Sequence, residues 1–344
     1  MSRWAVILAG GVGSRFWPLS TPRRPKQLLP LVTDSPLLAD TVARLAPLVP
    51  AERTLIVTNA SLAASVRALL PSLPSDNVIP EPRAAGTAPA LAWAATTIAK
   101  RGNPSDTMLC VHADWAIAND AEFRATLARA ADVAEREQSL VTVGIVPARP
   151  DPGFGYIEPG DALAGARRVK RFAEKPNRET AVTMVASGYL WNSGIFVWRA
   201  RDFLDEVRAH APEVAPFLPL AESGDIDRFF REVHPISVDE GVLERSARVL
   251  VIPGDFGWDD VGTWAALHRV RRRDAAGNAT FGDVHGVEAA NNVVHAEGGT
   301  VVLYGVNDLV VVSRDGMTLV TTKDRAAELK RLLDALPATV RELP

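Results

Sequence analysis

The sequence is poor in cysteine and has no long apolar run near its start. Cys110 is the one cysteine among 344 residues, which excludes a disulfide framework and suits a reducing compartment, so we expect a cytoplasmic protein. The most apolar stretch near the N-terminus, residues 5–9, is too short for a signal-peptide core or a membrane span. We therefore expect no membrane partner.

Neither sign of charge is in large excess. The chain has 38 Lys and Arg residues against 41 Asp and Glu residues, a net charge of −3, so it lacks the overall positive field that attracts a polyanion. Nucleic acid is accordingly not an expected partner. The hydrophobic share of 47% and the charged share of 23% are ordinary for a globular protein. The length has room for two or three domains with an ample core.

Two common phosphate-binding motifs are missing as well. No lysine directly follows the glycines after the first apolar run, as a P-loop requires, and Phe16 stands where the third glycine of a dinucleotide fingerprint would fall. The sequence has instead Gly10, Gly11 and Gly13, which let the backbone turn sharply and bring N–H groups against an anion. Standing alone, these glycines fit a tight strand-to-helix turn equally well.

Two cations follow the glycines. Arg15 and Lys26 are donors of the kind that a triphosphate needs, because they neutralise its charge and hydrogen-bond to its oxygens. Glycines and cations together make this segment a candidate site for an anionic ligand.

Short apolar runs alternate with helical patterns through the first half of the chain. Four continuous apolar runs are typical of buried parallel strands, at residues 4–9, 53–58, 106–112 and 139–146. Helical spacing and capping residues predict helices at residues 37–49, 60–70 and 87–101 and after Asn119-Asp120. This alternation predicts an α/β fold, with a Rossmann-like, mostly parallel sheet and helices on both faces.

The pattern changes after residue 150. Residues 154–200 are expected to mix strands with a short helix after Asn177, and residues 201–232 are expected to be helical. A further helix is expected after Thr263. Three acidic residues on the first of the helices beyond residue 200 are interpreted as a solvated face, namely Asp202, Asp205 and Glu206.

The C-terminal part has a composition of its own. From about residue 280 to 322, short strands are broken by Gly, Asn or Asp, which predicts a small β-helix-like domain. An amphipathic helix is expected to close it over residues 324–336. We expect domain 1 at residues 1–272 and the small β domain with its terminal helix at residues 273–344.

An ordered series of motifs resembles one family. The first block is Gly-Gly-x-Gly-Ser-Arg-x-Trp-Pro-Leu-Ser at residues 10–20, with Pro-Lys-Gln at residues 25–27. The blocks that follow in order are Glu81-Pro82, Thr87-Ala-Pro-Ala90, Ala113-Asp114, Gly155-Tyr156-Ile157, residues 172–176, residues 191–196, Ser237-Val-Asp239 with Glu244, and residues 256–264. Together they resemble the sugar-1-phosphate nucleotidyltransferases, and within that family the mannose-1-phosphate guanylyltransferases.

The resemblance implies an enzyme that transfers GMP from GTP to mannose 1-phosphate, with GDP-mannose and pyrophosphate as products. It implies Mg²⁺ as cofactor and makes GTP and mannose 1-phosphate the expected partners. Two alternatives stay open. One is a related enzyme with another sugar or purine, such as a GDP-heptose, GDP-glucose or ADP-sugar synthase. The other is a non-catalytic nucleotide-sugar sensor.

The resemblance also assigns roles to residues. Arg15 and Lys26 would be the catalytic cations, and Asp114 and Asp260 would hold Mg²⁺. The nucleotide-binding residues would be Leu8, Gly10, Gly11, Gly13, Ser14, Glu81, Pro82 and Thr87. The sugar-phosphate-binding residues would be Gly155, Glu174, Lys175 and Asn192. By residue type alone, Asp114 equally fits a strand-end turn, and Asp260 a helix cap.

The chain departs from the family pattern at several positions. Ala85-Gly86 stands where the family has Arg-Asn, and Arg83 is the nearby candidate to replace the missing arginine. Trp115 stands where the family usually has His, and Asp259 replaces a common serine. The preferred sugar and purine are therefore open.

The small β domain bears on assembly. By resemblance it is a β-helical tail that often supports dimer contacts, so a homodimer is one hypothesis and a monomer with a β cap is the other. Longer members of the family carry an isomerase domain after this point, whereas this sequence stops at Pro344. We therefore expect no isomerase activity.

Overall fold

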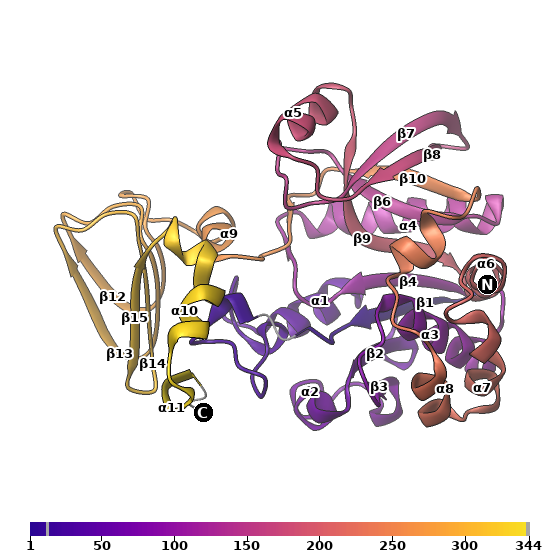
Figure 1. The fold of residues 1–344 in the computed structure, drawn as a ribbon, viewed down its shortest axis with the longest axis horizontal. Coiled ribbons are helices and arrows are strands. Elements are labelled where there is room, and N and C mark those ends of the chain that lie inside the picture. Colours follow the sequence, from indigo (N-terminus) through magenta and orange to yellow (C-terminus); the bar gives the residue numbers. More distant parts are fainter. Residues whose placement is uncertain (12–13, 342–344) are drawn as a thin grey trace. The chain divides into compact units, whose positions relative to one another are not determined.

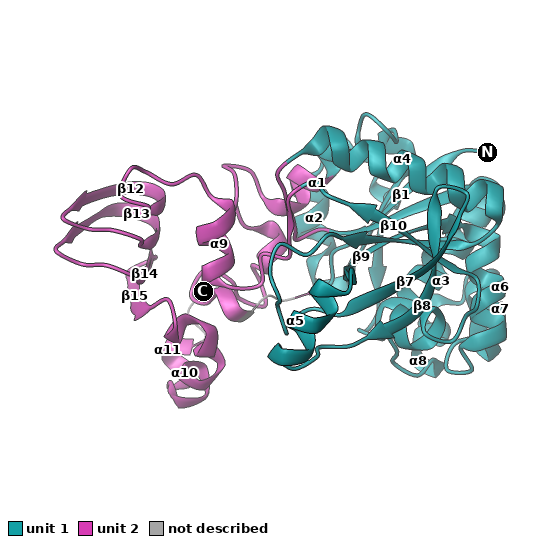
Figure 2. Ribbon diagram, turned by 90° about the horizontal axis from the view of Figure 1, so that it is seen from above, with its two compact units in different colours: residues 1–10, 42–112, 119–256 teal, residues 11–41, 113–118, 257–344 magenta. Residues whose placement is uncertain are grey.

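The computed structural model describes residues 1–11 and 14–341. The chain divides into two compact units, which Figure 2 colours separately. Unit 1 comprises residues 1–10, 42–112 and 119–256, and unit 2 comprises residues 11–41, 113–118 and 257–344. Each unit is thus assembled from three separate segments. The domain boundary expected at residue 272 falls inside unit 2 and stays a prediction.

Unit 1 is built on a nine-stranded sheet with the order β3-β2-β1-β4-β9-β6-β10-β8-β7 (Figure 1). Its strands are β1 (Arg3–Leu8), β2 (Thr54–Asn59), β3 (Val78–Glu81), β4 (Thr107–His112), β6 (Leu140–Ile145), β7 (Tyr156–Leu163), β8 (Ala166–Ala173), β9 (Leu190–Arg199) and β10 (Val249–Gly254). The expected α/β fold is confirmed, and the four strands predicted from apolar runs form β1, β2, β4 and β6.

Strand direction in this sheet is mixed in the middle and at one edge. β3, β2, β1 and β4 are parallel to one another, and so are β6 and β10. β9 lies between β4 and β6 and is antiparallel to both, and β7 and β8 form an antiparallel pair beyond β10. The expected parallel sheet is therefore interrupted, because the inserted segment that begins near residue 154 contributes β9 to the middle of the sheet.

Helices cover both faces of the sheet (Figure 1). Val6 and Leu8 of β1 pack in one core cluster with α3 (Thr87–Arg101). α4 (Asp120–Glu137) lies against β4, β6, β9 and β10, and the Asn119 side chain caps it by accepting from the Glu122 N–H. Both faces of the sheet are therefore shielded from solvent, which explains why the central strands are continuous apolar runs.

Two predicted helices are shorter than expected. α1 (Leu37–Leu45) stops before Pro47, because the residue that precedes a proline is pushed out of the helical region. The second begins as a 3₁₀ turn over residues 60–62, and its α-helical part, α2 (Ala63–Leu69), follows. The helices expected beyond residue 150 are confirmed as α5 (Arg178–Ala186), α6 (Ala200–His210), α7 (Leu218–Ser223) and α8 (Ile226–Glu232).

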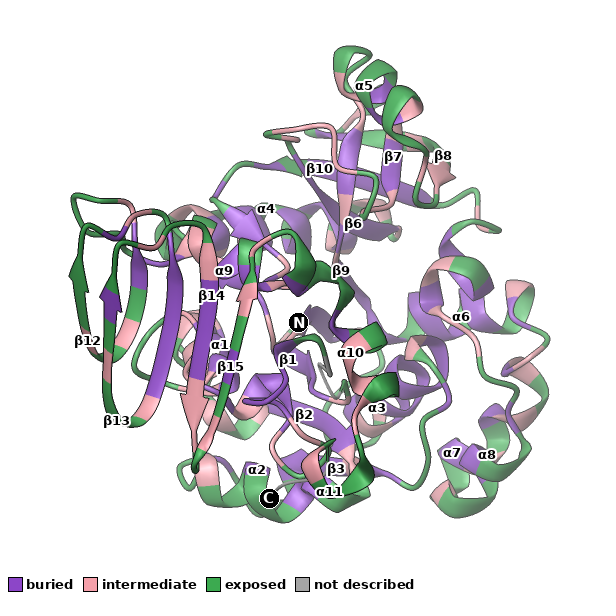
Figure 3. Ribbon diagram, turned by 60° about the vertical axis from the view of Figure 1, so that its left-hand side comes forward, coloured by how far each residue is buried: buried purple, intermediate pink, exposed green. Residues whose placement is uncertain are grey.

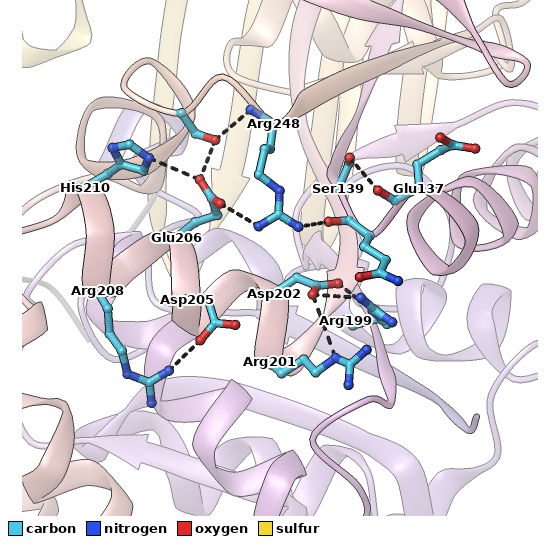
Figure 4. Close-up of polar contacts among 12 residues, drawn as sticks. Glu137, Ser139, Arg199, Arg201, Asp202, Asp205, Glu206, Arg208, His210 and Arg248 are labelled. Atoms are coloured by element: carbon cyan, nitrogen blue, oxygen red, sulfur yellow. Dashed lines mark hydrogen bonds and ion pairs between the residues drawn. The ribbon is translucent and has the colours of Figure 1, made fainter.

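The acidic face expected on α6 is wrong for two of its three residues. Asp202 and Glu206 are each 5% exposed, whereas Asp205 is exposed and pairs with Arg208. Figure 4 shows the reason: Asp202 pairs with Arg199, and the Glu206 carboxylate accepts from Ser246 and Arg248. These arginines neutralise the buried charges, so α6 is attached to neighbouring elements through its acids.

Unit 2 contains a two-stranded and a four-stranded sheet. β5 (Ala116–Ile117) pairs with β11 (Trp258–Asp259). The larger sheet has the order β12 (Ala279–Val287), β13 (Val293–Tyr304), β14 (Leu309–Arg314) and β15 (Met317–Thr322). β12, β13 and β14 are parallel, and such parallel stacking of consecutive short strands is the pattern of a β-helix. The predicted β-helix-like tail is thus confirmed.

A separate core holds unit 2 together. Figure 3 shows buried residues on β13 and β14, whereas β12 and β15 are largely exposed. Val293, Val310 and Val312 pack with Leu29 and Leu31, together with apolar residues of α9 (Trp264–Val270) and α10 (Leu329–Ala335). A last short helix, α11 (Ala338–Arg341), follows. The segment around residues 16–37 thus belongs to the same core as the β-helix-like sheet.

Across the part of the chain that the structure describes, no helix has the length and apolar character needed to cross a membrane.

Candidate functional site

The pairing of β5 with β11 brings two of the predicted site residues together. The pair is antiparallel, with Asp259 opposite Ala116, so residues just before Ala116 lie near residues just after Asp259. Asp114 and Asp260 are therefore neighbours in space although 146 positions separate them in the sequence. The side chain that joins them is Lys26.

Lys26 opens the 3₁₀ turn η2 (Lys26–Leu28) and is 5% exposed. Its ammonium donates to Asp114 Oδ2 at 3.1 Å and to the backbone oxygen of Asp260 at 2.6 Å. A buried ammonium must be paired, so these two oxygens fix the position of Nζ. The structure thus gathers three predicted site residues from three distant segments of unit 2.

The electrostatics of Asp260 reflect this crowding. Burial raises the pKa of its carboxyl, and the charge of Lys26 opposes the rise. The neighbouring carboxylates Asp259 and Asp114 raise the pKa further, whereas the Gly262 N–H, which donates to Asp260 Oδ1 at 3.1 Å, lowers it. Two carboxylates near one cation make a region where a second positive charge would be stabilised.

Arg15 is a further predicted site residue of unit 2. The exposed Arg15 lies in η1 (Ser14–Phe16), and its guanidinium donates to the Gly262 oxygen at 3.5 Å. Arg15 is therefore close to Asp260 and has donors left for a ligand. Gly11 is exposed. Gly13 lies outside the described residues.

In unit 1, the turn after β1 is bound to β2 and approaches β3. The Asn59 side chain donates to the Gly10 oxygen at 2.8 Å. A Cβ on Gly10 would lie 3.5 Å from the Glu81 carboxylate, so the glycine leaves this edge of the sheet open beside Glu81. Leu8 packs its side chain into the core, so only its backbone is left for a nucleotide.

Glu81 is a buried carboxylate at the end of β3. It is 8% exposed, and burial raises its pKa to about 7. Within the part of the chain that is described, no hydrogen bond or ion pair of its carboxylate is found. Its carboxylate oxygens are therefore reachable from solvent and can still accept hydrogen bonds from a ligand. The next residue, Pro82, is exposed.

Thr87 is placed differently from its predicted role. Its hydroxyl accepts from the Val238 N–H at 2.8 Å at the start of α3. The side chain thus joins α3 to the segment before residue 239. Its assignment to the nucleotide stays a prediction.

Three of the sugar-phosphate residues lie together in unit 1. The Asn192 N–H donates to the Gly155 oxygen at 2.8 Å. A Cβ at Gly155 would lie 3.0 Å from the Glu174 carboxylate and 3.5 Å from Asn192 Cβ, so a larger residue there would crowd both side chains. Lys175, with φ of 39°, pairs its ammonium with Glu174 at 2.7 Å, and both side chains are exposed.

Asp239 is a site residue that the assignment of roles left out. Its carboxylate accepts from the Asn192 side-chain amide at 2.7 Å. Burial raises its pKa, and the Asn192 hydrogen bond opposes the rise. The Asn192 carbonyl oxygen faces away from Asp239 and accepts from the Gly194 N–H at 3.3 Å. Asp239 was visible in the sequence only as part of a family motif.

The family departures have local explanations in unit 1. Gly86 has φ of 85°, and a Cβ there would lie 2.2 Å from the Ile236 oxygen, so no other residue fits. Ala85 is fully buried and its oxygen accepts from the Ile236 N–H. The guanidinium of Arg83 donates to the Val233 oxygen at 2.7 Å, and its role as a substitute for the missing arginine stays a hypothesis.

Two departures in unit 2 are also explained by packing. Asp259 is 6% exposed, and its carboxylate accepts from Arg269 of α9 and from the Val261 N–H. It therefore stabilises the loop that carries Asp260. Trp115 is buried edge-to-face against Trp258, with ring centroids 6.0 Å apart. Neither side chain is free for a ligand.

Comparison with known proteins identifies the family. Residues 4–277 match the family described as Nucleotidyl transferase, and residues 282–336 match the MannoseP isomerase/GMP-like beta-helix domain. The mannose-1-phosphate guanylyltransferase of Escherichia coli K12 is 39% identical over 98% of this chain and 74% of its own length. The alginate biosynthesis protein AlgA of Pseudomonas aeruginosa is 37% identical over 98% of this chain and 72% of its own length.

A solved structure agrees. The protein from Thermus thermophilus described as mannose-1-phosphate geranyltransferase has a TM-score of 0.89 and 34% identity, covering 97% of this chain and 99% of that one. The resemblance drawn from the ordered motifs is thereby confirmed. Since the family match spans residues 4–277 and these relatives align over nearly the whole chain, the chain belongs to the nucleotidyl transferase family, within its group of mannose-1-phosphate guanylyltransferases.

Proposed function

We propose that the chain transfers GMP from GTP to mannose 1-phosphate, forming GDP-mannose and releasing pyrophosphate. The observation that carries the proposal is the buried Lys26 ammonium, held by Asp114 and the backbone of Asp260. A fixed cation beside two carboxylates suits a ligand that is a polyphosphate with a divalent cation. The names of the relatives from Escherichia coli and Salmonella support the two substrates.

The reaction requires positioning and charge compensation more than covalent help. An oxygen of the sugar phosphate attacks the α-phosphorus of GTP, the bond from that phosphorus to the β-phosphate oxygen breaks, and pyrophosphate leaves. Negative charge accumulates on the leaving group. In the proposal Lys26 and Arg15 stabilise it, because preorganised cations lower the energy of a charged transition state.

The residues present fit Mg²⁺. Among the described residues no group of three or more His, Cys, Asp or Glu side chains could enclose a metal, and Mg²⁺ in such enzymes typically takes one or two carboxylates and completes its shell with water and phosphate oxygens. Asp114 and Asp260 supply such a pair. When bound there, Mg²⁺ would neutralise phosphate charge and orient the triphosphate.

Glu81 supports a guanine base. An ionised carboxylate accepts two hydrogen bonds in parallel, and the guanine edge offers an N–H and an NH₂ side by side. Adenine presents an acceptor in place of that N–H, so it would face the carboxylate with a repulsive contact. In the proposal Glu81 thus selects guanine and gains the partner that the described residues do not provide.

The contacts of Asn192 support a sugar site in unit 1. Asp239 accepts from the Asn192 amide nitrogen, and the Asn192 carbonyl oxygen accepts from the Gly194 N–H at 3.3 Å, which leaves one lone pair of that oxygen to accept from a hydroxyl. Glu174 offers a second acceptor and Lys175 a cation for the sugar's phosphate. Gly155 keeps the space beside them open.

One observation favours a second substrate. Ala85-Gly86 lacks the two polar side chains of the family pattern, and the backbone around Gly86 admits no larger residue. The alternative is therefore a related enzyme with another sugar or purine, such as a GDP-heptose, GDP-glucose or ADP-sugar synthase.

Release of pyrophosphate across the four nucleoside triphosphates and a panel of hexose and heptose 1-phosphates tests these proposals. We expect the highest kcat/KM with GTP and mannose 1-phosphate, and none when Lys26 is replaced by Met. A higher kcat/KM for another pair would select the alternative. Calorimetric binding without turnover of any purine triphosphate would contradict an enzyme and indicate a sensor.

We also infer a homodimer formed through the β-helix-like sheet. Val302 and Tyr304 of β13 and Val287 of β12 are more than half exposed, and Val287 is the cross-strand neighbour of Tyr304. Light scattering should give twice the mass of the chain, and the monomer mass for Tyr304→Glu. A monomeric wild-type protein would contradict the inference.

A further inference from the structure

A chain of polar contacts in unit 2 joins the β-helix-like sheet to the segment that carries Lys26. Its first link is between Arg24, two residues before Lys26, and Glu297 at the middle of β13. The guanidinium and the carboxylate form two parallel hydrogen bonds, at 2.6 and 2.9 Å. Such a bidentate pair fixes orientation as well as distance.

The second link runs from Glu297 through His295 to Arg271. His295 is fully buried, two residues before Glu297 on the same face of β13. Its Nε2 lies 3.2 Å from Glu297, and its Nδ1 lies 2.9 Å from Arg271 Nη2. The Arg271 Nε in turn donates to the Leu31 oxygen at 2.5 Å, five residues after Lys26. The chain therefore attaches the segment on both sides of the lysine.

The protonation of His295 follows from these partners. A guanidinium has donors only, so Nδ1 of His295 must accept from Arg271. The proton of the neutral ring is then on Nε2, which donates to Glu297. Stacking of the ring on Phe281, with centroids 4.3 Å apart, fixes its plane. Each hydrogen bond of His295 thus has a defined donor and a defined acceptor.

The backbone of the attached segment forms further hydrogen bonds within unit 2. Arg314 Nη1 donates to the Leu19 oxygen at 3.1 Å, and Thr21 and Arg24 close a tight turn by exchanging backbone hydrogen bonds. Leu29 and Leu31 are buried in the core of unit 2. Apolar side chains on both sides of Lys26, among them Leu19 and Leu29, pack in this core, and the Arg24–Glu297 pair adds a bidentate charged contact two residues before the lysine.

We propose that Glu297 is a positioning residue for Lys26. It acts through Arg24 on one side and through His295 and Arg271 on the other, so that the β-helix-like sheet sets the place of the lysine. This inference rests on the proposed function for the role of Lys26 in the transfer. It gives the C-terminal sheet a part in the reaction.

The effect on rate follows from the sensitivity of a preorganised cation. A displacement of about 1 Å at a reacting centre can cost on the order of 100-fold in rate. Loss of the Arg24–Glu297 pair frees the residues just before Lys26, so its ammonium would sample more positions. We expect kcat to fall more than KM rises, because the lost interaction belongs to the transition state.

The test uses Arg24→Ala and Glu297→Ala in the full chain, with two measurements. Hydrogen exchange of the amides of residues 24–29 should become about tenfold faster in both variants, since local opening becomes easier. In the pyrophosphate-release assay kcat should fall by about 10- to 100-fold, with KM for mannose 1-phosphate within about twofold of wild type. The Arg24 side chain is partly exposed, so this variant is expected to fold even if Glu297→Ala does not.

Lys323→Ala is the matched control, because Lys323 pairs with Asp308 at 3.4 Å in the same sheet and not with the Lys26 segment. It should leave both measurements unchanged. Faster exchange with unchanged kcat in Arg24→Ala would overturn the positioning role. Unchanged exchange would overturn the attachment itself.

The Lys26→Met variant separates this inference from the proposed function. If Lys26→Met turns over normally, the proposed role of Lys26 fails, whatever the exchange shows. If Lys26→Met is impaired but Arg24→Ala is not, only the positioning role fails. Combining Arg24→Ala with Lys26→Met should give no further loss, since both remove one interaction, whereas additive losses would indicate that Arg24 acts elsewhere.

Discussion

Asp114 and Asp260 hold the same lysine, one through its carboxylate and the other through its backbone oxygen. Replacing either carboxylate with Asn keeps its shape, and Asn Oδ1 at position 260 can still accept from the Gly262 N–H. The structural contacts therefore survive while a negative charge is lost. The effect on turnover should exceed the effect on folding.

We expect Asp114→Asn and Asp260→Asn each to lower kcat at least about 100-fold, the range found when one transition-state contact is removed. The pyrophosphate-release assay at increasing Mg²⁺ measures this. Asp34→Asn, at an exposed position of unit 2, should be as active as wild type. A variant with near-normal turnover at saturating Mg²⁺ would be removed from the set of metal ligands.

We expect Glu81 to make the use of GTP depend on pH. Its pKa is about 7, so the fraction of ionised carboxylate rises about tenfold between pH 6 and pH 8. If the ionised form accepts from guanine, KM for GTP should fall by about that factor over this range. Glu81→Gln should lose the dependence, and Glu52→Gln, at an exposed position of unit 1, should keep it. A pH-independent KM in wild type would argue against the contact.

Glu81 also affects the stability of the fold. Rising pH should improve the binding of GTP, but it should make folding less favourable. A carboxyl whose folded pKa lies above its usual 4.5 makes folding most favourable below that value, and the advantage is lost as pH rises to about 7. At pH 8 Glu81→Gln should therefore raise the free energy of unfolding, by up to about 3 kcal/mol. Urea unfolding at pH 8 and pH 4 measures it. An equal effect at both values would show that burial of charge is not the cause.

At the scale of elements, α6 illustrates attachment through buried acids (Figure 4). Glu206 accepts from Ser246 and Arg248, which lie just before β10. Loss of the Glu206 charge leaves Arg248 without its ion-pair partner, but the Arg248 side chain is 46% exposed and can be solvated by water. The cost should therefore lie below that of a fully buried pair.

We expect Glu206→Gln to lower the free energy of unfolding by about 1–2 kcal/mol without changing kcat. Asp205→Asn is the control on the same helix, because Asp205 is exposed and its pair with Arg208 should contribute less than about 0.5 kcal/mol. Urea unfolding compares the two. Equal losses of unfolding free energy in the two variants would show that the burial of Glu206 adds nothing to stability.

Short elements also decide the candidate site. β5 and β11 have two residues each, too few to be predicted from alternation of apolar residues. Their pairing nevertheless places Asp114 beside Asp260. The glycines, the apolar strands and the helix caps were predictable because each depends on residues within a few positions.

At the scale of the whole molecule, charge is arranged locally. A net charge of −3 gives no general attraction for a triphosphate, so in the proposed function the affinity comes from Arg15, Lys26 and a bound cation. The charged chain around Glu297 similarly makes unit 2 sensitive to acid. Burial raises the pKa of Glu297, but hydrogen bonds from His295 and Arg24 outweigh it and hold the value at about 2.

The titrations of Glu297 and His295 change the stability of the fold in the same direction. A carboxyl with a lowered pKa contributes stability above pH 4.5, and the contribution is lost as pH falls toward 2. Burial lowers the pKa of His295 as well, so the unfolded chain takes up a proton below pH 6.5 that the folded chain does not. The contribution of these two groups to stability should therefore fall steadily on acidification from about pH 6.5.

We expect Glu297→Gln to be less stable than wild type at pH 7, by about 2–3 kcal/mol, and to approach the stability of wild type as pH falls to about 2. Urea unfolding followed by tryptophan fluorescence across this range measures the difference. The free energy of unfolding of Lys323→Ala should depend on pH in the same way as that of wild type. A constant difference between Glu297→Gln and wild type at all pH values would show that ionisation of Glu297 is not involved.

The sequence by itself determined the α/β class, the Gly-rich turn after the first strand, the β-helix-like tail and the family. These depend on periodicity, capping and ordered motifs, which are local or additive along the chain. It also named Lys26, Asp114 and Asp260 through the resemblance, but it contained nothing that measures the distance between them.

Only the tertiary structure decided which side chains meet. Lys26 reaches Asp114 across 88 positions, and Arg24 reaches Glu297 across 273. It also showed that Arg83 binds a carbonyl oxygen of unit 1 and that Asp202 and Glu206 are buried. Such contacts arise from strand order and from the folding of distant segments into one core, and neither leaves a regular pattern in the local sequence.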